Sequence, residues 1–402
     1  MKTQLDVAHH TPEGREAEAI LRSCVHCGFC TATCPTYQEL HDERDGPRGR
    51  IYLIKQLLEG GEVTENTRVH LDRCLQCRSC ETTCPSGVEY GRLLDYGRAV
   101  LEKQLPRTRE DQFKRWAIRK ILPYASLFGS LLKAGQLFRP LLPEVIKRKV
   151  PEKQNISSPW PSNSHRRKMV VLTGCAQPSA TPQTNLSAAR VLDKLGISLV
   201  EVPKAGCCGA VSYHLSAREE GLDFARRNID AWWPAVEAGA EAIVMTASGC
   251  GSMVKEYGHL LKHDRDYSNK AEKISDITCD LSEILLDEDL SRLALPVAEG
   301  RVAVHCPCSL QHGQKLPASV EAVLEKAGIP LAKTTDSHFC CGSAGTYSLL
   351  QPAMSKQLLS NKIRALTMED PDVIATANIG CQLHLASGTE TPVRHWIELL
   401  DK

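Results

Sequence analysis

Long apolar runs are missing from this 402-residue sequence. The longest nearly apolar stretch, residues 121–132, has 12 residues, well short of the roughly 20 that a membrane-spanning helix needs. The first 20 residues hold four acidic side chains and no apolar segment, so neither a secretory signal nor a transit peptide is readable. We therefore expect a cytoplasmic protein that does not cross a membrane. Peripheral attachment to the inner face of the plasma membrane is expected from one of the two interpretations of the basic residues 106–150, given below.

An excess of charge of one sign is also missing. Lys and Arg number 49 against 48 Asp and Glu, a net charge of +1, which argues against nucleic acid as the main partner. Hydrophobic residues make up 42% of the chain and charged residues 24%, which excludes a disordered chain. The sequence has no Gly-x-Gly-x-x-Gly fingerprint and no P-loop, so nothing indicates that it binds its own flavin or nucleotide.

Cysteine, by contrast, is abundant, with 18 residues, and in a reducing compartment this number favours metal binding over disulfides. Eight of them form two runs of the pattern Cys-x2-Cys-x2-Cys-x3-Cys-Pro, 50 residues apart. This pattern is typical of two-cluster ferredoxins, in which the last cysteine of each run ligates the other cluster, and it is rare in zinc sites. We therefore predict two [4Fe-4S] clusters, one held by Cys24, Cys27, Cys30 and Cys84, the other by Cys74, Cys77, Cys80 and Cys34.

The region around these runs is predicted to be a mainly α-helical ferredoxin-like domain, residues 1–105. Between the runs, residues 50–58 have helical periodicity and end at two glycines. A basic connector, residues 106–166, follows. Its first part, residues 106–150, is predicted to form helices broken near Pro123, Pro140 and Pro143. This part carries 11 Lys or Arg against three acidic residues, with aromatic residues between them. Helices with this composition suit contact with an anionic membrane surface or with a quinone-reducing partner. They suit equally well a helix pair that packs on the ferredoxin-like domain.

A second repeat, with an offset near 133, fills the rest of the chain. Each copy alternates apolar runs with helical patterns: we predict strands near 169–172, 197–203 and 242–245 and near 302–304, 329–334 and 373–375, with helices at 185–195 and 317–327. The expected fold is a duplicated α/β region with parallel strands, residues 167–290 and 291–402. Its cysteines should meet at the carboxyl edge of the strands. Cys279, outside the repeats, is predicted to be a small buried hydrophobic residue.

The repeated cysteines are candidate ligands of a third centre. Each copy contains a Cys-Cys-Gly triplet, whose glycine, Gly209 or Gly342, permits the unusual backbone that two adjacent ligands need. A cluster, a zinc ion or a redox thiol pair all suit this geometry. The second copy adds Cys306 and has His305, His312 and His338 nearby, although a structural role is the better interpretation of each histidine alone. We predict that any third centre lies at Cys308, Cys340, Cys341 and Cys381, with Cys175, Cys207, Cys208 and Cys250 as the weaker candidate.

These triplets resemble the cysteine-rich "CCG" domains found in heterodisulfide reductases, anaerobic glycerol-3-phosphate dehydrogenases and lactate-utilisation proteins. Within that group, the chain resembles the iron–sulfur subunits of bacterial glycolate oxidases over residues 20–400, in motifs such as CVHCGFCTATCPTY, DGPRGRIYLIKQ, RNIDAWWPA, HCPC, CCGSAGTY and VRHWIE. The heterodisulfide reductase motif ends in Cys-x2-Cys, whereas Met253 and His384 stand at the last position here.

The resemblance implies an oxidoreductase complex in which FAD-binding partner subunits oxidise glycolate to glyoxylate. This chain then carries the electrons toward a membrane quinone or another acceptor, and it supplies no catalytic residue for glycolate. Three alternatives stay open. The chain itself reduces a disulfide or quinone at the triplets, it serves a sister complex acting on glycerol-3-phosphate, lactate or another 2-hydroxy acid, or its second half is a zinc-stapled docking module.

Overall fold

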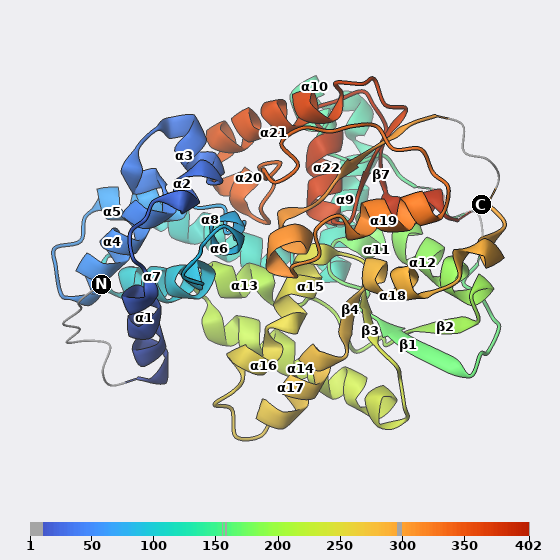
Figure 1. The fold of residues 1–402 in the computed structure, drawn as a ribbon, viewed down its shortest axis with the longest axis horizontal. Coiled ribbons are helices and arrows are strands. Elements are labelled where there is room, and N and C mark those ends of the chain that lie inside the picture. The colour runs from blue at the N-terminus through green and yellow to red at the C-terminus, as the bar shows by residue number, and fades with distance from the viewer. Residues whose placement is uncertain (1–10, 155, 157–158, 296–299, 402) are drawn as a thin grey trace. The chain divides into compact units, whose positions relative to one another are not determined.

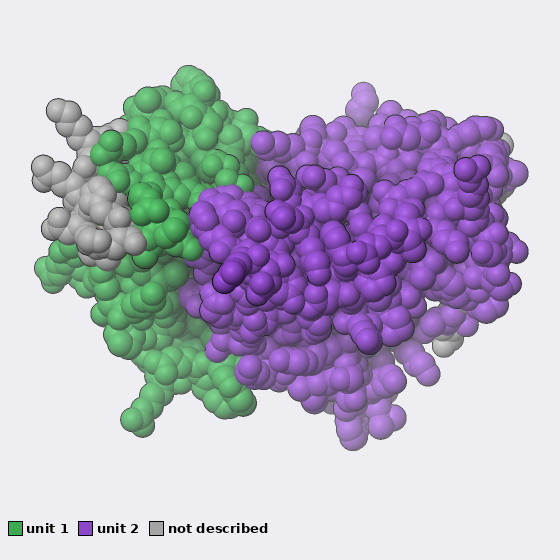
Figure 2. Space-filling model, turned by 90° about the horizontal axis from the view of Figure 1, so that it is seen from below, with its two compact units in different colours: residues 1–116, 338–358 green, residues 117–337, 359–402 purple. Residues whose placement is uncertain are grey.

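The structure is a computed structural model that describes residues 11–154, 156, 159–295 and 300–401 (Figure 1). It divides into two compact units, one of residues 1–116 and 338–358, the other of residues 117–337 and 359–402 (Figure 2). The linker predicted near residues 151–166 contains residues 155, 157 and 158, which lie outside the described residues. No helix in the described part of the chain is both long and apolar enough to span a membrane.

The first unit is helical, as predicted for the ferredoxin-like region. The helix expected at 50–58 is present as α4 (Pro47–Leu58), and it packs closely on α7 (Tyr90–Gln104). A Cβ atom added at Gly97 would lie 2.8 Å from Cγ1 of Ile54, so only glycine allows this approach. The other elements are α1 (Pro12–Ser23), α2 (Phe29–Ala32), α3 (Pro35–Leu40), η1 (Glu43–Asp45), α5 (Glu65–Asp72), α6 (Ser79–Thr82) and α20 (Tyr347–Leu350), with the beginnings of α8 (Arg109–Ile121) and α21 (Pro352–Leu366).

Two parallel sheets form the second unit, which confirms the predicted α/β region. The first sheet has the order β2-β1-β3-β4 and the second β5-β6-β7. Register pairs Val170 with Ile243 in the first sheet and His305 with Thr376 in the second. The strands are β1 (Arg167–Val171), β2 (Ile197–Glu201), β3 (Ile243–Met245), β4 (Thr278–Asp280), β5 (Val302–His305), β6 (Val373–Thr376) and β7 (Val393–His395).

One predicted strand is wrong. The segment 329–334 forms a single bridge, between Leu331 and Val302, instead of a strand. Pro330 lies beside this bridge and has no N–H to donate, so it cannot extend a ladder of hydrogen bonds. Strands β4 and β7 are additions that the sequence pattern did not indicate, because each has only three residues.

Helices cover both sheets, and one hydrophobic core joins the two repeats. Buried side chains in this core include Val171 and Leu192 from the first repeat and Val304 and Trp396 from the second. The predicted helices are present as α12 (Gln183–Lys194) and α19 (Ser319–Lys326). The remaining elements are α11 (Gln177–Ala180), α13 (Ala210–His214), α14 (Arg218–Glu237), α15 (Ser248–Lys255), α16 (Tyr257–Leu260), α17 (Ser268–Asp276), α18 (Leu281–Asp287), η3 (Leu290–Leu293), η4 (Ser309–Gly313), α22 (Ile379–Ala386) and η5 (Trp396–Leu399).

The lone cysteine of the sequence pattern, Cys279, lies on β4. It is half-buried, and it packs against the core that joins the repeats. Its side chain therefore acts as a small hydrophobic group, as predicted, although it is not fully buried.

The basic connector forms helices, with breaks at the predicted prolines. After α8 come α9 (Ala125–Leu137), η2 (Arg139–Leu141) and α10 (Glu144–Lys147). Within the second unit, Glu220 of α14 accepts from Arg119 at 3.0 Å and from Lys120 at 3.3 Å. Much of the apolar surface of α9 and η2 stays outside the core: Leu131 is 50% exposed, Leu137 75% and Leu141 82%. The connector is therefore anchored by ion pairs and leaves an apolar surface uncovered.

Candidate metal centres

The two ferredoxin-type cysteine runs fold in the same way. Each run has left-handed backbone two and four residues after its first cysteine, and then enters a four-residue helix, α2 or α6. The equivalent hydroxyls of Thr33 and Thr83, 50 residues apart, lie 3.1 Å from each other. The sequence repeat is thus a pair of matching loops in space. The left-handed residues are His26, Gly28, Gln76 and Arg78.

Two cavities in the first unit are each lined by a set of four cysteines, and the first is also bordered by a fifth, Cys80. In both, three cysteines of one run meet the last cysteine of the other run. Four thiols are the ligand set of a [4Fe-4S] cluster, so the donors present fit this cofactor. Cys80 borders both cavities, which makes them neighbours. The first cavity is lined by Cys24, Cys27, Cys30 and Cys84, the second by Cys34, Cys74, Cys77 and Cys80.

The two cavities differ in their distance from solvent. Cys27, beside the first cavity, is exposed, and its neighbours Val25 and Phe29 are 66% and 62% exposed. The cysteines that define the second cavity are all buried. Burial raises the pKa of Cys80 well above its usual value, so this thiol stays protonated until a metal displaces the proton. The first cavity is therefore the one with access to the surface.

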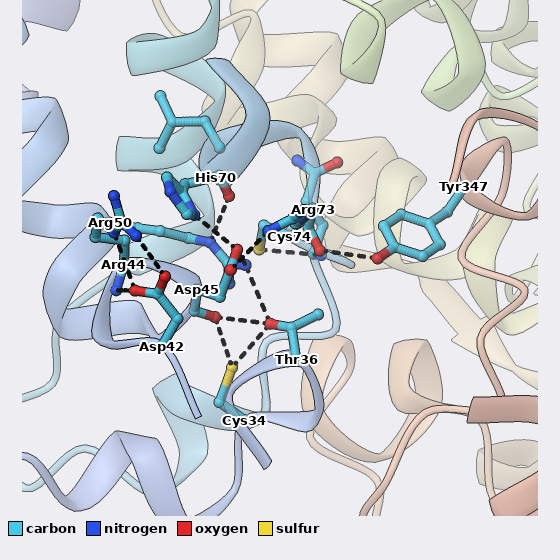
Figure 3. Close-up of polar contacts among 12 residues, drawn as sticks. Cys34, Thr36, Asp42, Arg44, Asp45, Arg50, His70, Arg73, Cys74 and Tyr347 are labelled. Carbon is cyan, nitrogen blue, oxygen red and sulfur yellow. Dashed lines mark hydrogen bonds and ion pairs between the residues drawn. The ribbon is translucent and has the colours of Figure 1, made fainter. Parts of the chain in front are cut away.

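Figure 3 shows a buried network of charges around Arg50, a residue that lines the second cavity. The Arg50 guanidinium is 3.4 Å from the Asp45 carboxylate, and both side chains are 1% exposed. Arg50 also donates to the Thr36 hydroxyl at 3.1 Å and to the His70 carbonyl at 2.8 Å. The Cys34 thiol lies 3.7 Å from the backbone carbonyl of Asp45. The network therefore reaches a predicted cluster ligand directly.

Arg50 keeps its positive charge in this environment. Burial opposes the charge, but the nearby Cys74, Tyr90, Cys34 and Asp45 raise the pKa of the Arg50 guanidinium above its usual value. A buried cation favours the more negative, reduced form of a neighbouring cluster and so raises its reduction potential. Sequence reasoning missed this role. The signal for it is an arginine on the buried face of the helix in the motif DGPRGRIYLIKQ.

Both Cys-Cys-Gly triplets adopt the same tight turn. Gly209 has φ +90° and Gly342 has φ +88°, and a Cβ atom on either would lie within 2.6 Å of a backbone oxygen. In each turn the glycine N–H donates to the sulfur two residues earlier, Cys207 or Cys340, at 3.4 Å. The prediction that these glycines permit an unusual backbone is therefore confirmed.

The first repeat brings its four cysteines together. Cys207 lies close enough to Cys175 and Cys208 for these thiols to shift its pKa, and Cys250 does the same to Cys208. The contact with Cys207 and burial raise the pKa of Cys175 well above its usual value. The pKa values of Cys207 and Cys208 are raised as well, so these three thiols favour the protonated form when no metal is bound. A soft metal would fit this all-sulfur set.

The cysteines of the second repeat are divided between the two units. Cys340 and Cys341 belong to the segment 338–358 of the first unit, and Cys306, Cys308 and Cys381 belong to the second. Within the first unit, the hydroxyl of Tyr347 donates to the carbonyl of Arg73 at 3.0 Å, directly before Cys74. This bond ties the segment that carries the second triplet to the loop of the buried cavity.

Two buried histidines of the second sheet have different surroundings. His395 is 1% exposed; its Nε2 lies 2.8 Å from the Thr246 carbonyl, and its Nδ1 accepts from Ile397 N at 3.3 Å. His305 is equally buried, but neither ring nitrogen has a hydrogen-bond partner among the described residues. Burial, and to a smaller extent Lys362, lower the pKa of His305 well below its usual value, so its ring is neutral.

Known families match both halves of the chain. A 4Fe-4S dicluster domain matches residues 20–88, and a cysteine-rich (CCG) domain matches residues 169–255 and 302–386. The glycolate oxidase iron–sulfur subunit of Escherichia coli (strain K12) is 54% identical over 100% of this chain and 99% of its own. The chain belongs to the family of glycolate oxidase iron–sulfur subunits. A probable member from Bacillus subtilis (strain 168) is 31% identical over 94% of this chain and 90% of its own.

More distant relatives share parts of the chain or the fold. Lactate utilization protein A of Anoxybacillus flavithermus is 26% identical over 54% of this chain and 91% of its own. A crystal structure of a hypothetical protein from Helicobacter pylori has a TM-score of 0.55 and 13% identity, and the match covers 98% of this chain and 73% of that one. This structural match shows a shared fold.

We predict that Arg50→Met destabilises the first unit by about 3 kcal/mol, because Asp45 loses its fully buried arginine partner and keeps only the partly exposed Arg73, at 3.0 Å. Chemical unfolding of the anaerobically prepared protein measures this change. If each cavity holds a [4Fe-4S] cluster, redox titration of the same variant should show a lower reduction potential for the cluster of the second cavity and a nearly unchanged one for the first.

Arg44→Met is the matched control. Arg44 pairs with Asp42 in the same loop, but its side chain is 56% exposed, so its loss should change stability and potential little. Equal effects of the two variants would contradict the role given to the buried pair.

Proposed function

We propose that the chain is the electron-transfer subunit of a glycolate-oxidising complex. FAD-binding partner subunits oxidise glycolate to glyoxylate, and this chain accepts the electrons one at a time and passes them on. The observation that carries the proposal is the pair of neighbouring cavities, in each of which three cysteines of one run meet the last cysteine of the other. The 54% identity to the glycolate oxidase iron–sulfur subunit supports the choice of substrate.

Each cavity holds one [4Fe-4S] cluster in this proposal, with crossed ligands. Cys24, Cys27, Cys30 and Cys84 ligate the first cluster, and Cys74, Cys77, Cys80 and Cys34 the second. The cavity linings support this division. Crossing brings the clusters close together, and the shared border at Cys80 supports direct electron transfer between them.

Electrons enter this subunit at the first cluster and move to the second. The exposed surface at Cys27 supports the first as the contact point for a redox partner, and buried Arg50 supports the second as the stronger acceptor. A third centre at Cys308, Cys340, Cys341 and Cys381 comes next. The bond from Tyr347 to Arg73 supports this order, because it holds the second triplet beside the loop of the second cluster. Cys175, Cys207, Cys208 and Cys250 form a further candidate metal set.

The final acceptor is a membrane quinone, reached from the cytoplasmic face. The exposed apolar side chains of α9 and η2 support peripheral membrane contact, since Leu137 and Leu141 lie next to Arg139 in sequence and basic residues follow at 147–149. Apolar side chains flanked by cations suit the headgroup region of an anionic bilayer.

The crossed ligation predicts a specific pattern of damage. Cys34→Ser should perturb chiefly the cluster whose other ligands come from the second run, and Cys84→Ser the cluster of the first run. Electron paramagnetic resonance of the two reduced variants distinguishes the clusters. If each variant disturbs only the cluster of its own run, the ligation is not crossed.

The division of labour with flavin subunits gives a second test. Anaerobic addition of glycolate should leave the visible absorbance of the isolated chain unchanged and should bleach its clusters once flavin subunits are added. Dithionite is the control, because it should reduce the clusters in both samples. Reduction of the flavin-free chain by glycolate alone would contradict the proposal.

A further inference from the structure

His305 is the last residue of β5, and its surroundings are unusual for a buried histidine. The side chain is 1% exposed, yet neither ring nitrogen has a hydrogen-bond partner among the described residues. Buried polar groups without partners are rare in folded proteins because they lose their bonds to water and gain nothing in return. His395, equally buried in the same sheet, shows the ordinary arrangement, with both nitrogens bonded.

Other polar atoms near the same sheet edge also lack partners. Thr376 is paired with His305 across β5 and β6, and its hydroxyl is buried with no hydrogen-bond partner in the described structure. The side-chain oxygen of Gln382, on α22, is in the same situation. Unsatisfied groups gathered at the carboxyl ends of two parallel strands indicate a ligand position, because this is the edge at which α/β sheets bind ligands.

A thiol lies within reach of the His305 ring. A ring nitrogen of His305 and the sulfur of Cys381 are within 4.8 Å of each other, and both residues are buried. Two donors on one tetrahedral metal, at about 2.3 Å for sulfur and 2.0–2.1 Å for nitrogen, lie ~3.6 Å apart. The Asn378 side-chain amide donates to the Cys381 sulfur at 3.4 Å. Such outer bonds orient ligating sulfurs in metal sites.

The first repeat does not share this feature. The position equivalent to His305, 133 residues earlier, is Leu172, which is buried in an apolar core. The polar side chains at the sheet edge of the first repeat bond to one another instead: Gln177 donates to Thr246 at 2.7 Å and to Asn185 at 2.6 Å. A histidine without partners therefore distinguishes the second repeat from the first at the same point of the fold.

We propose that His305 is a nitrogen ligand, together with Cys381, of a metal centre at the carboxyl edge of β5 and β6. The metal is either an iron of an iron–sulfur cluster or a zinc ion, since both accept mixed thiolate and imidazole ligands. This assignment rests on the proposed third centre of the second repeat and adds to it a ligand that is not a cysteine.

The test compares the full-length wild type with His305→Leu and Cys381→Ser, all prepared anaerobically. His305→Leu copies the residue of the first repeat, so the strand should tolerate it, and His305→Gln is the second variant. Iron and zinc per chain are counted by mass spectrometry. Nitrogen coordination is read from pulsed electron paramagnetic resonance for iron and from X-ray absorption for zinc.

The wild type should show imidazole coordination, and both histidine variants should lose it. Both histidine variants and Cys381→Ser should also lose the metal of one centre. The loss is about four iron atoms per chain for a cluster, or one zinc ion. His395→Gln is the matched control: an equally buried histidine with bonded nitrogens, whose loss should leave metal content and nitrogen coordination unchanged. Circular dichroism checks that every variant is folded.

Two results overturn the inference in distinguishable ways. If Cys381→Ser loses metal while His305→Leu keeps wild-type metal content and nitrogen coordination, the third centre stands and His305 is not its ligand. If neither Cys381→Ser nor Cys340→Ser loses metal, the third centre itself is absent from the second repeat, and the proposed ligand falls with it.

Discussion

The proposed clusters place one requirement on the fold: four thiols from two distant parts of the chain must meet at each cluster. A run of three closely spaced cysteines supplies three ligands from one loop. The fourth comes from 54 or more residues away for the first cluster and from 40 or more residues away for the second. Helix α4, which lies between the runs, packs so closely on α7, which follows the second run, that a side chain at position 97 would clash with Ile54.

Both cavities offer the same type of ligand set, four cysteine thiols. Any difference in reduction potential between clusters bound there must therefore come from the residues around the cavities. The first cavity is bordered by an exposed cysteine and exposed apolar side chains, and the second by a buried guanidinium that is held by Asp45. Solvent exposure and nearby charge both tune the potential of an iron–sulfur cluster. Matching loops in different environments would therefore give the two proposed clusters different reduction potentials. The two α/β repeats also combine matching Cys-Cys-Gly turns with different surroundings. At equivalent positions, the first repeat has the apolar Leu172 and the second has His305.

Much of this could be predicted from the sequence, for definite physical reasons. Cysteine spacing is set by cluster geometry, so the composition of both cavities followed from the two runs alone. The helix at 50–58 and most strands followed from apolar periodicity. The strand predicted at 329–334 is wrong, because Pro330 has no N–H and cannot extend the hydrogen-bond ladder that the apolar residues around it suggest. The buried Arg50–Asp45 pair and the lack of hydrogen-bond partners at His305 could not be predicted from the sequence, because burial and hydrogen bonding depend on the folded chain. Similarly, no local pattern places residues 338–358 with the first unit.

The central claim is that this chain holds two cubane clusters in its first unit. The most direct measurement is Mössbauer spectroscopy of the full-length protein, prepared anaerobically with ⁵⁷Fe, together with chemical analysis of iron and acid-labile sulfide. We expect at least about eight iron atoms and eight sulfides per chain, with the signature of two [4Fe-4S] clusters, both lost in a variant that lacks all eight ferredoxin-type cysteines. A single cluster, or zinc in place of iron at these cysteines, would contradict it.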